Sequence, residues 1–132
     1  MTPRPLSPTV WTSPQLAPEA LADLAAAGVR RIISNRPDRE DPGQPTAAEM
    51  EAAARKAGMD FDWIPVSGMP APAQVAAAAA LLADGRPTVM FCRSGTRSAA
   101  LWAMSERTRG ADADDLRAAA ASAGYDLGRL PL

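Results

Sequence analysis

A strand, a short loop and a helix follow one another within residues 88–104, and this stretch constrains the fold most. Residues 88–91 (Thr-Val-Met-Phe) are apolar and β-prone, whereas the segment from Ala99 onward is rich in helix-favouring Ala, Leu and Met. Between them lie Cys92, the only cysteine of the chain, and Arg97, five positions later. The stretch therefore predicts a loop that carries Cys92 from a buried strand into a helix N-terminus.

The chemistry of such a loop makes Cys92 the candidate nucleophile. A loop entering a helix directs several backbone N–H groups at one place, and the helix dipole favours negative charge there. A thiol at this place should lose its proton more easily, and the thiolate is the reactive form. Arg97 has a planar fork that suits an oxyanion. We expect the anion-binding loop to comprise Arg93, Ser94, Gly95, Thr96, Arg97 and Ser98.

Two residues of this stretch also have simpler interpretations. Free cysteines are often small buried apolar residues, so Cys92 alone would not indicate chemistry. Its coincidence with a glycine, an arginine and a helix start is what favours a functional role. Ser98 either hydrogen-bonds the Cys92 sulfur or only starts the helix.

Composition narrows the class of protein and its location. The chain has 132 residues, 47% of them hydrophobic, with a net charge of −1, so we expect one domain spanning residues 1–132, with residues 1–8 as an extended N-terminal arm. This charge gives no reason to expect nucleic-acid binding, and no apolar run is long enough for a membrane helix. A single cysteine and no signal-peptide pattern favour the cytoplasm.

Histidine does not occur in the chain, and this limits the chemistry that Cys92 can perform. Cys-His dyads, His-based triads and His-ligated metal sites are all excluded. Any activation of Cys92 must come from backbone dipoles, amides and arginines. We expect neither a metal nor a cofactor.

Alternating strand and helix patterns predict an α/β fold. Glycines and prolines delimit segments that read as strands at 9–12 (at a sheet edge), 29–34, 61–66 and 88–91, and as helices at 18–27, 46–57, 72–82, 99 onward and 113–123. This order implies a three-layer arrangement, with a mostly parallel sheet of four to five strands and helices on both faces.

Ligands of such sheets bind beyond the carboxyl ends of the strands. The loops after Ser34 and Val66 end at the same edge as the Cys92 loop, which predicts pocket residues Asn35, Arg36, Asp38, Asp41 and Ser67. Asp38 and Asp41 are equally well explained as turn-forming aspartates. Arg36 either lines the pocket or pairs with Asp38 or Glu40.

Several short motifs together resemble a known family. They are Asn35-Arg36-Pro37-Asp38, Pro45-Thr46-Ala47-Ala48-Glu49, Ile64-Pro65-Val66, residues 92–98 (Cys-Arg-Ser-Gly-Thr-Arg-Ser) with Leu101-Trp102-Ala103, and Ala123-Gly124-Tyr125-Asp126. From about Trp11 to Leu130 the chain resembles the beta-lactamase-hydrolase-like, phosphatase-like domain family, whose members also carry the label of sulfur transferase. The resemblance implies a cysteine-phosphatase-like fold similar to dual-specificity phosphatases, a Cys nucleophile and an Arg in the phosphate-binding loop.

The chain departs from the phosphatase pattern at three places. Phe91 stands where phosphatase loops usually have His, and four residues rather than five separate Cys92 from Arg97. The shorter loop resembles that of rhodanese-type sulfurtransferases. The general-acid Asp expected after the Ile-Pro-Val strand is absent, which leaves Asp38 or Asp41 as acids from a different loop.

Three functions therefore stay open. The first is a phosphatase-like hydrolase in which Cys92 attacks phosphorus, Arg97 stabilises the transferred group and Asp38 protonates the leaving oxygen. The second is a rhodanese-like sulfurtransferase that carries a Cys92 persulfide and works with a partner enzyme of sulfur metabolism. The third is a non-catalytic anion-binding or partner-binding module. The first two predict a small anionic substrate, either a phosphate ester or a sulfane-sulfur donor.

Overall fold

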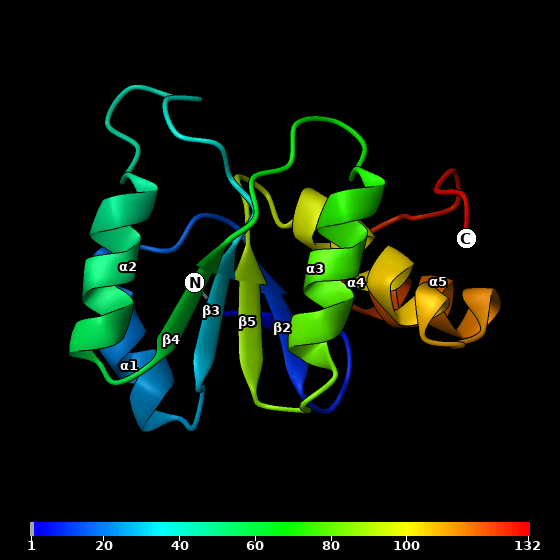
Figure 1. Cartoon of the computed structure of the whole chain (residues 1–132), viewed down its shortest axis with the longest axis horizontal. Coiled ribbons are helices and arrows are strands. Elements are labelled where there is room, and N and C mark those ends of the chain that lie inside the picture. The colour runs from blue at the N-terminus through cyan, green and yellow to red at the C-terminus, as the bar shows by residue number, and fades with distance from the viewer. Residues whose placement is uncertain (1) are drawn as a thin grey trace.

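Five strands form one mixed sheet in the computed structural model, which describes residues 2–132 (Figure 1). In spatial order the strands are β1, β2, β5, β3 and β4. β1 runs antiparallel to β2, and all other neighbours are parallel. The strands comprise β1 (Arg4–Pro5), β2 (Val10–Ser13), β3 (Arg31–Ser34), β4 (Asp60–Trp63) and β5 (Thr88–Phe91).

Helices cover both faces of the sheet, so the predicted three-layer α/β fold is confirmed. In Figure 1, α1 and α2 lie on one side of the sheet and α3, α4 and α5 on the other. The helical elements comprise a 3-10 turn (Pro18–Ala20), α1 (Leu21–Ala26), α2 (Ala47–Lys56), α3 (Pro72–Leu82), α4 (Thr96–Thr108) and α5 (Ala113–Ser122).

β3 and β5 contribute side chains to a hydrophobic core on each face of the sheet, because successive side chains of a strand point to opposite faces. Ile32 of β3 pairs with Val89 of β5, and both belong to the core shared with α1 and α2. Ile33 pairs with Met90, and both belong to the core shared with α3, α4 and α5. Every residue of these strands is buried, as the uninterrupted apolar run at residues 88–91 indicates for a parallel strand.

Local sequence signals set several helix boundaries. The Thr46 hydroxyl accepts a hydrogen bond from the Glu49 amide at 3.1 Å, and the Glu49 carboxylate accepts one from the Thr46 amide, which confirms the predicted capping box of α2. Asp112 caps α5 by accepting from the Asp115 amide at 3.0 Å.

The N-terminal region differs from the sequence prediction. The arm expected at residues 1–8 begins at Met1, which lies outside the described residues, and its Arg4–Pro5 portion forms β1. β1 pairs with the outer side of β2, so the strand predicted at the sheet edge lies inside the sheet.

The strand predicted at residues 61–66 is shorter in the structure. β4 ends at Trp63, before Pro65, which has no N–H to offer a neighbouring strand. No helix within residues 2–132 is long and apolar enough to span a bilayer.

Candidate active site

Cys92 lies directly after β5, at the carboxyl edge of the sheet. Its amide donates to the Ser13 carbonyl at 3.3 Å, which holds the loop to β2. Its side chain is fully buried. The sulfur nevertheless has a polar partner, because the Gly95 amide donates a hydrogen bond to Sγ at 3.0 Å. The thiol is therefore bound to the backbone of its own loop and not enclosed by hydrocarbon alone.

Gly95 makes the turn that takes the loop into α4. Its φ of +96° lies in the left-handed region, which favours glycine. A β-carbon at this position would also collide with the Tyr125 hydroxyl. Thr96 then begins α4, so the predicted sequence of strand, cysteine loop and helix is present.

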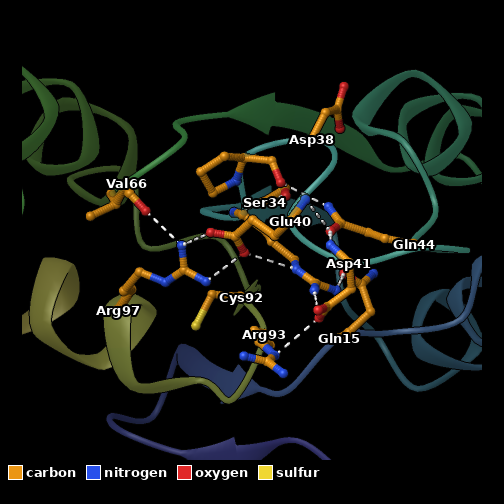
Figure 2. Close-up of polar contacts among 12 residues, drawn as sticks. Gln15, Ser34, Asp38, Glu40, Asp41, Gln44, Val66, Cys92, Arg93 and Arg97 are labelled. Atoms are coloured by element: carbon orange, nitrogen blue, oxygen red, sulfur yellow. Dashed lines mark hydrogen bonds and ion pairs between the residues drawn. The ribbon is translucent and has the colours of Figure 1, made fainter. Parts of the chain in front are cut away.

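Arg97 points from the first turn of α4 toward Cys92 and is held from the other side by Glu40 (Figure 2). Its Nη1 and Nη2 donate to the two Glu40 carboxylate oxygens at 2.7 and 2.8 Å. Nη1 also donates to the Val66 carbonyl at 2.8 Å. These three bonds use both N–H groups of Nη1 and one of Nη2, which leaves the Nε–H and the second Nη2–H outside them. The bond to Glu40 is the main cause that raises the pKa of Arg97; burial opposes it, and the Cys92 charge adds to it.

Glu40 bridges two arginines and was missed as a site residue by sequence reasoning, which considered it only as a partner of Arg36. Its Oε1 accepts from Arg36 Nε at 3.1 Å as well as from Arg97. The pKa of Glu40 is lowered to about 2, chiefly by the hydrogen bond from Arg97. Burial opposes this shift, and the hydrogen bond from Arg36 adds to it. Glu40 is therefore ionised at neutral pH.

The buried Arg36 connects Glu40 to Asp41 and Gln15. Its Nη2 donates to Asp41 at 2.6 Å, and its Nη1 donates to the Gln15 side chain at 3.0 Å. Asp41 also pairs with Arg93 Nε at 3.1 Å, although the Arg93 side chain is 67% exposed. Arg36 thus takes the ion-pair role, with Glu40 and Asp41 as its carboxylate partners.

Asn35 and Ser98 form a buried polar pair beneath the loop. The Ser98 hydroxyl donates to Asn35 Oδ1 at 2.7 Å, and Asn35 Nδ2 donates to the Ile64 carbonyl at 3.0 Å. Because a serine has one hydroxyl proton, this bond argues against Ser98 as a donor to the Cys92 sulfur. The pair instead fixes α4 against the end of β3.

The structure does not bring every predicted site residue to the cysteine. Asp38 Oδ1 accepts from the Ala47 amide at 2.8 Å at the start of α2, and Figure 2 shows its carboxylate directed away from Cys92. This placement argues against Asp38 as the proton donor. Ser67 is exposed, and the Val66 carbonyl contacts Arg97 in that loop. Ser94 and Thr96 are exposed and hydrogen-bonded to each other at 3.1 Å.

Across residues 2–132, no group of three His, Cys, Asp or Glu side chains could hold a metal ion.

Comparisons with known sequences extend over most of the chain. Residues 3–111 match the family described as "Beta-lactamase hydrolase-like protein, phosphatase-like domain". The chain is 38% identical over 110 residues to the beta-lactamase hydrolase-like protein of Xylella fastidiosa strain Temecula1, which covers 81% of this chain and 26% of that protein. It is 36% identical over 107 residues to the protein of the same name from Agrobacterium fabrum, covering 79% and 25%. The chain thus spans about a quarter of the length of these relatives.

Solved structures share the same fold. A protein of Neisseria meningitidis, described as a candidate phosphatase, superposes with a TM-score of 0.82 at 30% identity, covering 98% of this chain and 93% of the other. Kinase associated phosphatase superposes with a TM-score of 0.71 at 14% identity, covering 89% and 82%, which shows a common fold only. The fold is therefore that of the cysteine phosphatases, and the chain belongs to the family of phosphatase-like domains of beta-lactamase hydrolase-like proteins.

Proposed function

We propose that the chain is a cysteine-dependent hydrolase of phosphate esters, with Cys92 as nucleophile and Arg97 as the clamp for the transferred group. The observation that carries the proposal is the 3.0 Å hydrogen bond from the Gly95 amide to Cys92 Sγ at the start of α4. An amide and a helix N-terminus at the sulfur favour its anion. The two free N–H groups of Arg97 would then bind phosphoryl oxygens.

The reaction has two displacements. The Cys92 thiolate attacks phosphorus, an S–P bond forms, and the bond from phosphorus to the leaving oxygen breaks. Water then attacks the phosphocysteine, which releases inorganic phosphate and returns the thiolate. Arg97 and the loop amides would stabilise the charge on the peripheral oxygens in both transition states.

Neither Glu40 nor Asp38 is placed to donate a proton to the leaving oxygen, and this limits the class of substrate that the site would hydrolyse. Glu40 is ionised at neutral pH and paired with two arginines, and Asp38 is bound to the start of α2. A positioned acid typically contributes about 10²–10⁴-fold in rate. We therefore expect aryl phosphates, whose phenolate leaves without much help, to be better substrates than alkyl phosphates.

Turnover of para-nitrophenyl phosphate and of phosphotyrosine tests the proposal. The wild type should release phosphate, and Cys92→Ser should reduce the rate by at least about 10³-fold, because removal of a nucleophile abolishes the covalent route. A β-glycerophosphate control should be turned over far more slowly. Wild-type activity that survives in Cys92→Ser, or no activity at all, would overturn the proposal.

A rhodanese-like sulfurtransferase is the second candidate, favoured by the spacing of the loop and the missing acid. Only four residues separate Cys92 from Arg97. Transfer of a sulfane sulfur to a thiolate needs a good leaving group but no general acid. Intact-mass measurement after exposure to thiosulfate should then show one added sulfur in the wild type and none in Cys92→Ser. An unchanged mass would remove this candidate.

A further inference from the structure

Three successive carbonyl groups of the cysteine loop accept hydrogen bonds from donors outside the loop. The Arg93 carbonyl accepts from the Gln15 amide at 3.3 Å, and the Ser94 carbonyl accepts from the Tyr125 hydroxyl at 3.0 Å. The Gly95 carbonyl accepts from the Thr12 hydroxyl at 2.9 Å. The three donors come from the segment after β2, the segment after α5 and β2 itself.

These bonds control the direction of the amides on the same peptide groups. In a planar trans peptide, the C=O of one residue and the N–H of the next point in opposite directions. The bond from Tyr125 to the Ser94 carbonyl therefore turns the Gly95 N–H the other way. That N–H is the one that donates to Cys92 Sγ at 3.0 Å. The Gly95 carbonyl accepts from the Ala99 amide of α4 at 2.9 Å as well as from Thr12, so Thr12 and the first turn of the helix together hold the next peptide. The N–H of that peptide, from Thr96, donates to Ser94 Oγ at 3.4 Å.

The contact between Tyr125 and the loop is closely fitted. A β-carbon at residue 95 would overlap the Tyr125 hydroxyl and would lie only 3.2 Å from Thr12 Oγ1, so the glycine makes room for the Tyr125 hydroxyl. Tyr125 is largely buried, and this burial is the main cause that raises its pKa, so its hydroxyl stays a donor at neutral and moderately high pH. The residue lies beyond residues 3–111, the part of the chain that the family match covers.

We propose that Tyr125 is a positioning residue that acts through the Ser94–Gly95 peptide to aim an amide at the Cys92 sulfur, and that Thr12 supports it by holding the next peptide, where the loop enters α4. This inference deepens the proposed function and rests on its assignment of Cys92 as the reactive group. Tyr125 touches no substrate in this scheme. Its hydroxyl sets the orientation of the donor that stabilises the thiolate.

Tyr125→Phe tests the inference because it removes only the hydroxyl and keeps the ring. Cys92 is the sole cysteine, so the difference in ultraviolet thiolate absorbance between each variant and its Cys92→Ser counterpart reports on one sulfur. At a pH where the wild type is half ionised, we expect Tyr125→Phe to lower the thiolate-to-thiol ratio about three- to tenfold, the range expected for one weakened hydrogen bond. Turnover of para-nitrophenyl phosphate should fall about tenfold, less than for complete loss of an oxyanion donor.

Thr108→Val is the matched control for a second variant, Thr12→Val. Both replace a hydroxyl by a methyl group, but the Thr108 hydroxyl donates to the Ser105 carbonyl at 2.7 Å near the far end of α4. Thr12→Val should lower turnover, and Thr108→Val should leave turnover and the thiolate ratio unchanged. Thermal melting of each variant verifies that it is folded. If Tyr125→Phe does not fold, the inference is tested with Thr12→Val instead.

The result that overturns the inference is distinct from the one that overturns the proposed function. A folded Tyr125→Phe with the wild-type thiolate ratio, or a folded Thr12→Val with wild-type turnover of an active enzyme, would disprove the inference for that residue. A wild type without phosphatase activity would disprove the proposed function. A reduced thiolate ratio in Tyr125→Phe would in that case still support the positioning of the Cys92 sulfur.

Discussion

Glu40 and Arg97 lie 57 positions apart in the chain and meet through a two-pronged ion pair at 2.7 and 2.8 Å. The pair joins the loop after β3 to the first turn of α4. Because Glu40 also contacts Arg36, the guanidinium of Arg97 is held between a fixed carboxylate and the Val66 carbonyl. We infer that this pair orients the two remaining N–H groups of Arg97 toward a substrate.

Replacing Glu40 should therefore reduce the proposed activity without altering Cys92. Glu40→Gln retains the shape of the side chain but loses the charge that holds Arg97. We expect kcat/KM to fall about 10- to 100-fold, since small misplacements of a binding group cost up to about 10²-fold. Glu51→Gln is the control, because Glu51 pairs with Arg55 at 3.0 Å on the exposed side of α2. Equal activity in the two variants would contradict the positioning role.

The same carboxylate predicts a pH dependence of stability. The pKa of Glu40 is lowered in the folded protein from 4.5 to about 2, chiefly by its bond from Arg97. Above about 4.5 the carboxylate is ionised in both states and the ion pair contributes fully; as the pH falls toward about 2, the unfolded chain takes up the proton first and the contribution is lost. The urea midpoint of the wild type should therefore fall more steeply over this range than that of Glu40→Gln.

A second carboxylate, Asp84, also makes stability depend on pH, so the wild-type curve alone would not isolate the effect of Glu40. Its pKa is also lowered, first by a hydrogen bond from Arg31, so it contributes an acid dependence of the same sign. Both proteins retain Asp84, and the difference between their curves therefore isolates Glu40. Parallel curves would show that the Glu40 ion pair does not stabilise the fold.

Replacing Arg97 or Arg93 by lysine should have different effects on kcat. Arg97→Lys keeps the charge but loses the fork that can bind Glu40 and a phosphate at the same time. We expect a loss of about 10²-fold or more in kcat. Arg93→Lys, at a side chain that is 67% exposed, should change kcat by less than about threefold. Steady-state kinetics on para-nitrophenyl phosphate measure both, and a larger effect at Arg93 would reverse the assignment.

Two glycines with similar backbone angles allow the crowding at the cysteine loop to be measured. Gly95 and Gly110 have φ values of +96° and +100°, but only at Gly95 would a β-carbon meet other atoms. Gly110→Ala should cost about 1–2 kcal/mol from the left-handed backbone alone. Gly95→Ala should cost about 1–3 kcal/mol more, because it also collides with Tyr125. Chemical denaturation compares the variants, and equal losses would mean that the loop moves aside freely.

Sequence patterns predicted the parts of the site that are local in the chain. The apolar run before Cys92, the glycine at residue 95 and the helix after it lie within one short stretch, and their propensities all agree. The capping box of α2 was equally readable, because its two residues are three positions apart. The order of the strands and helices after β1 followed from the same local signals, whereas β1 lies in the segment that was expected to be an extended arm.

Contacts between distant segments were not predictable in this way. The loop after β3 offers Asp38, Glu40 and Asp41, and their spacing alone does not show which carboxylate turns toward Cys92. The answer depends on the start of α2, where the Ala47 amide binds Asp38 and leaves Glu40 to face Arg97. The hydrogen bond from the Tyr125 hydroxyl to the Ser94 carbonyl likewise arises only when α5 packs beside α4.

The position of Tyr125 has a consequence for where this domain should be cut. A protein shortened at residue 111, where the family match ends, would retain every residue from Cys92 to Ser98. It would lose α5, which packs against α4, together with the Tyr125 hydroxyl that donates to the Ser94 carbonyl of the cysteine loop. We expect such a fragment to preserve the motif in its sequence while losing the reactivity of its sulfur.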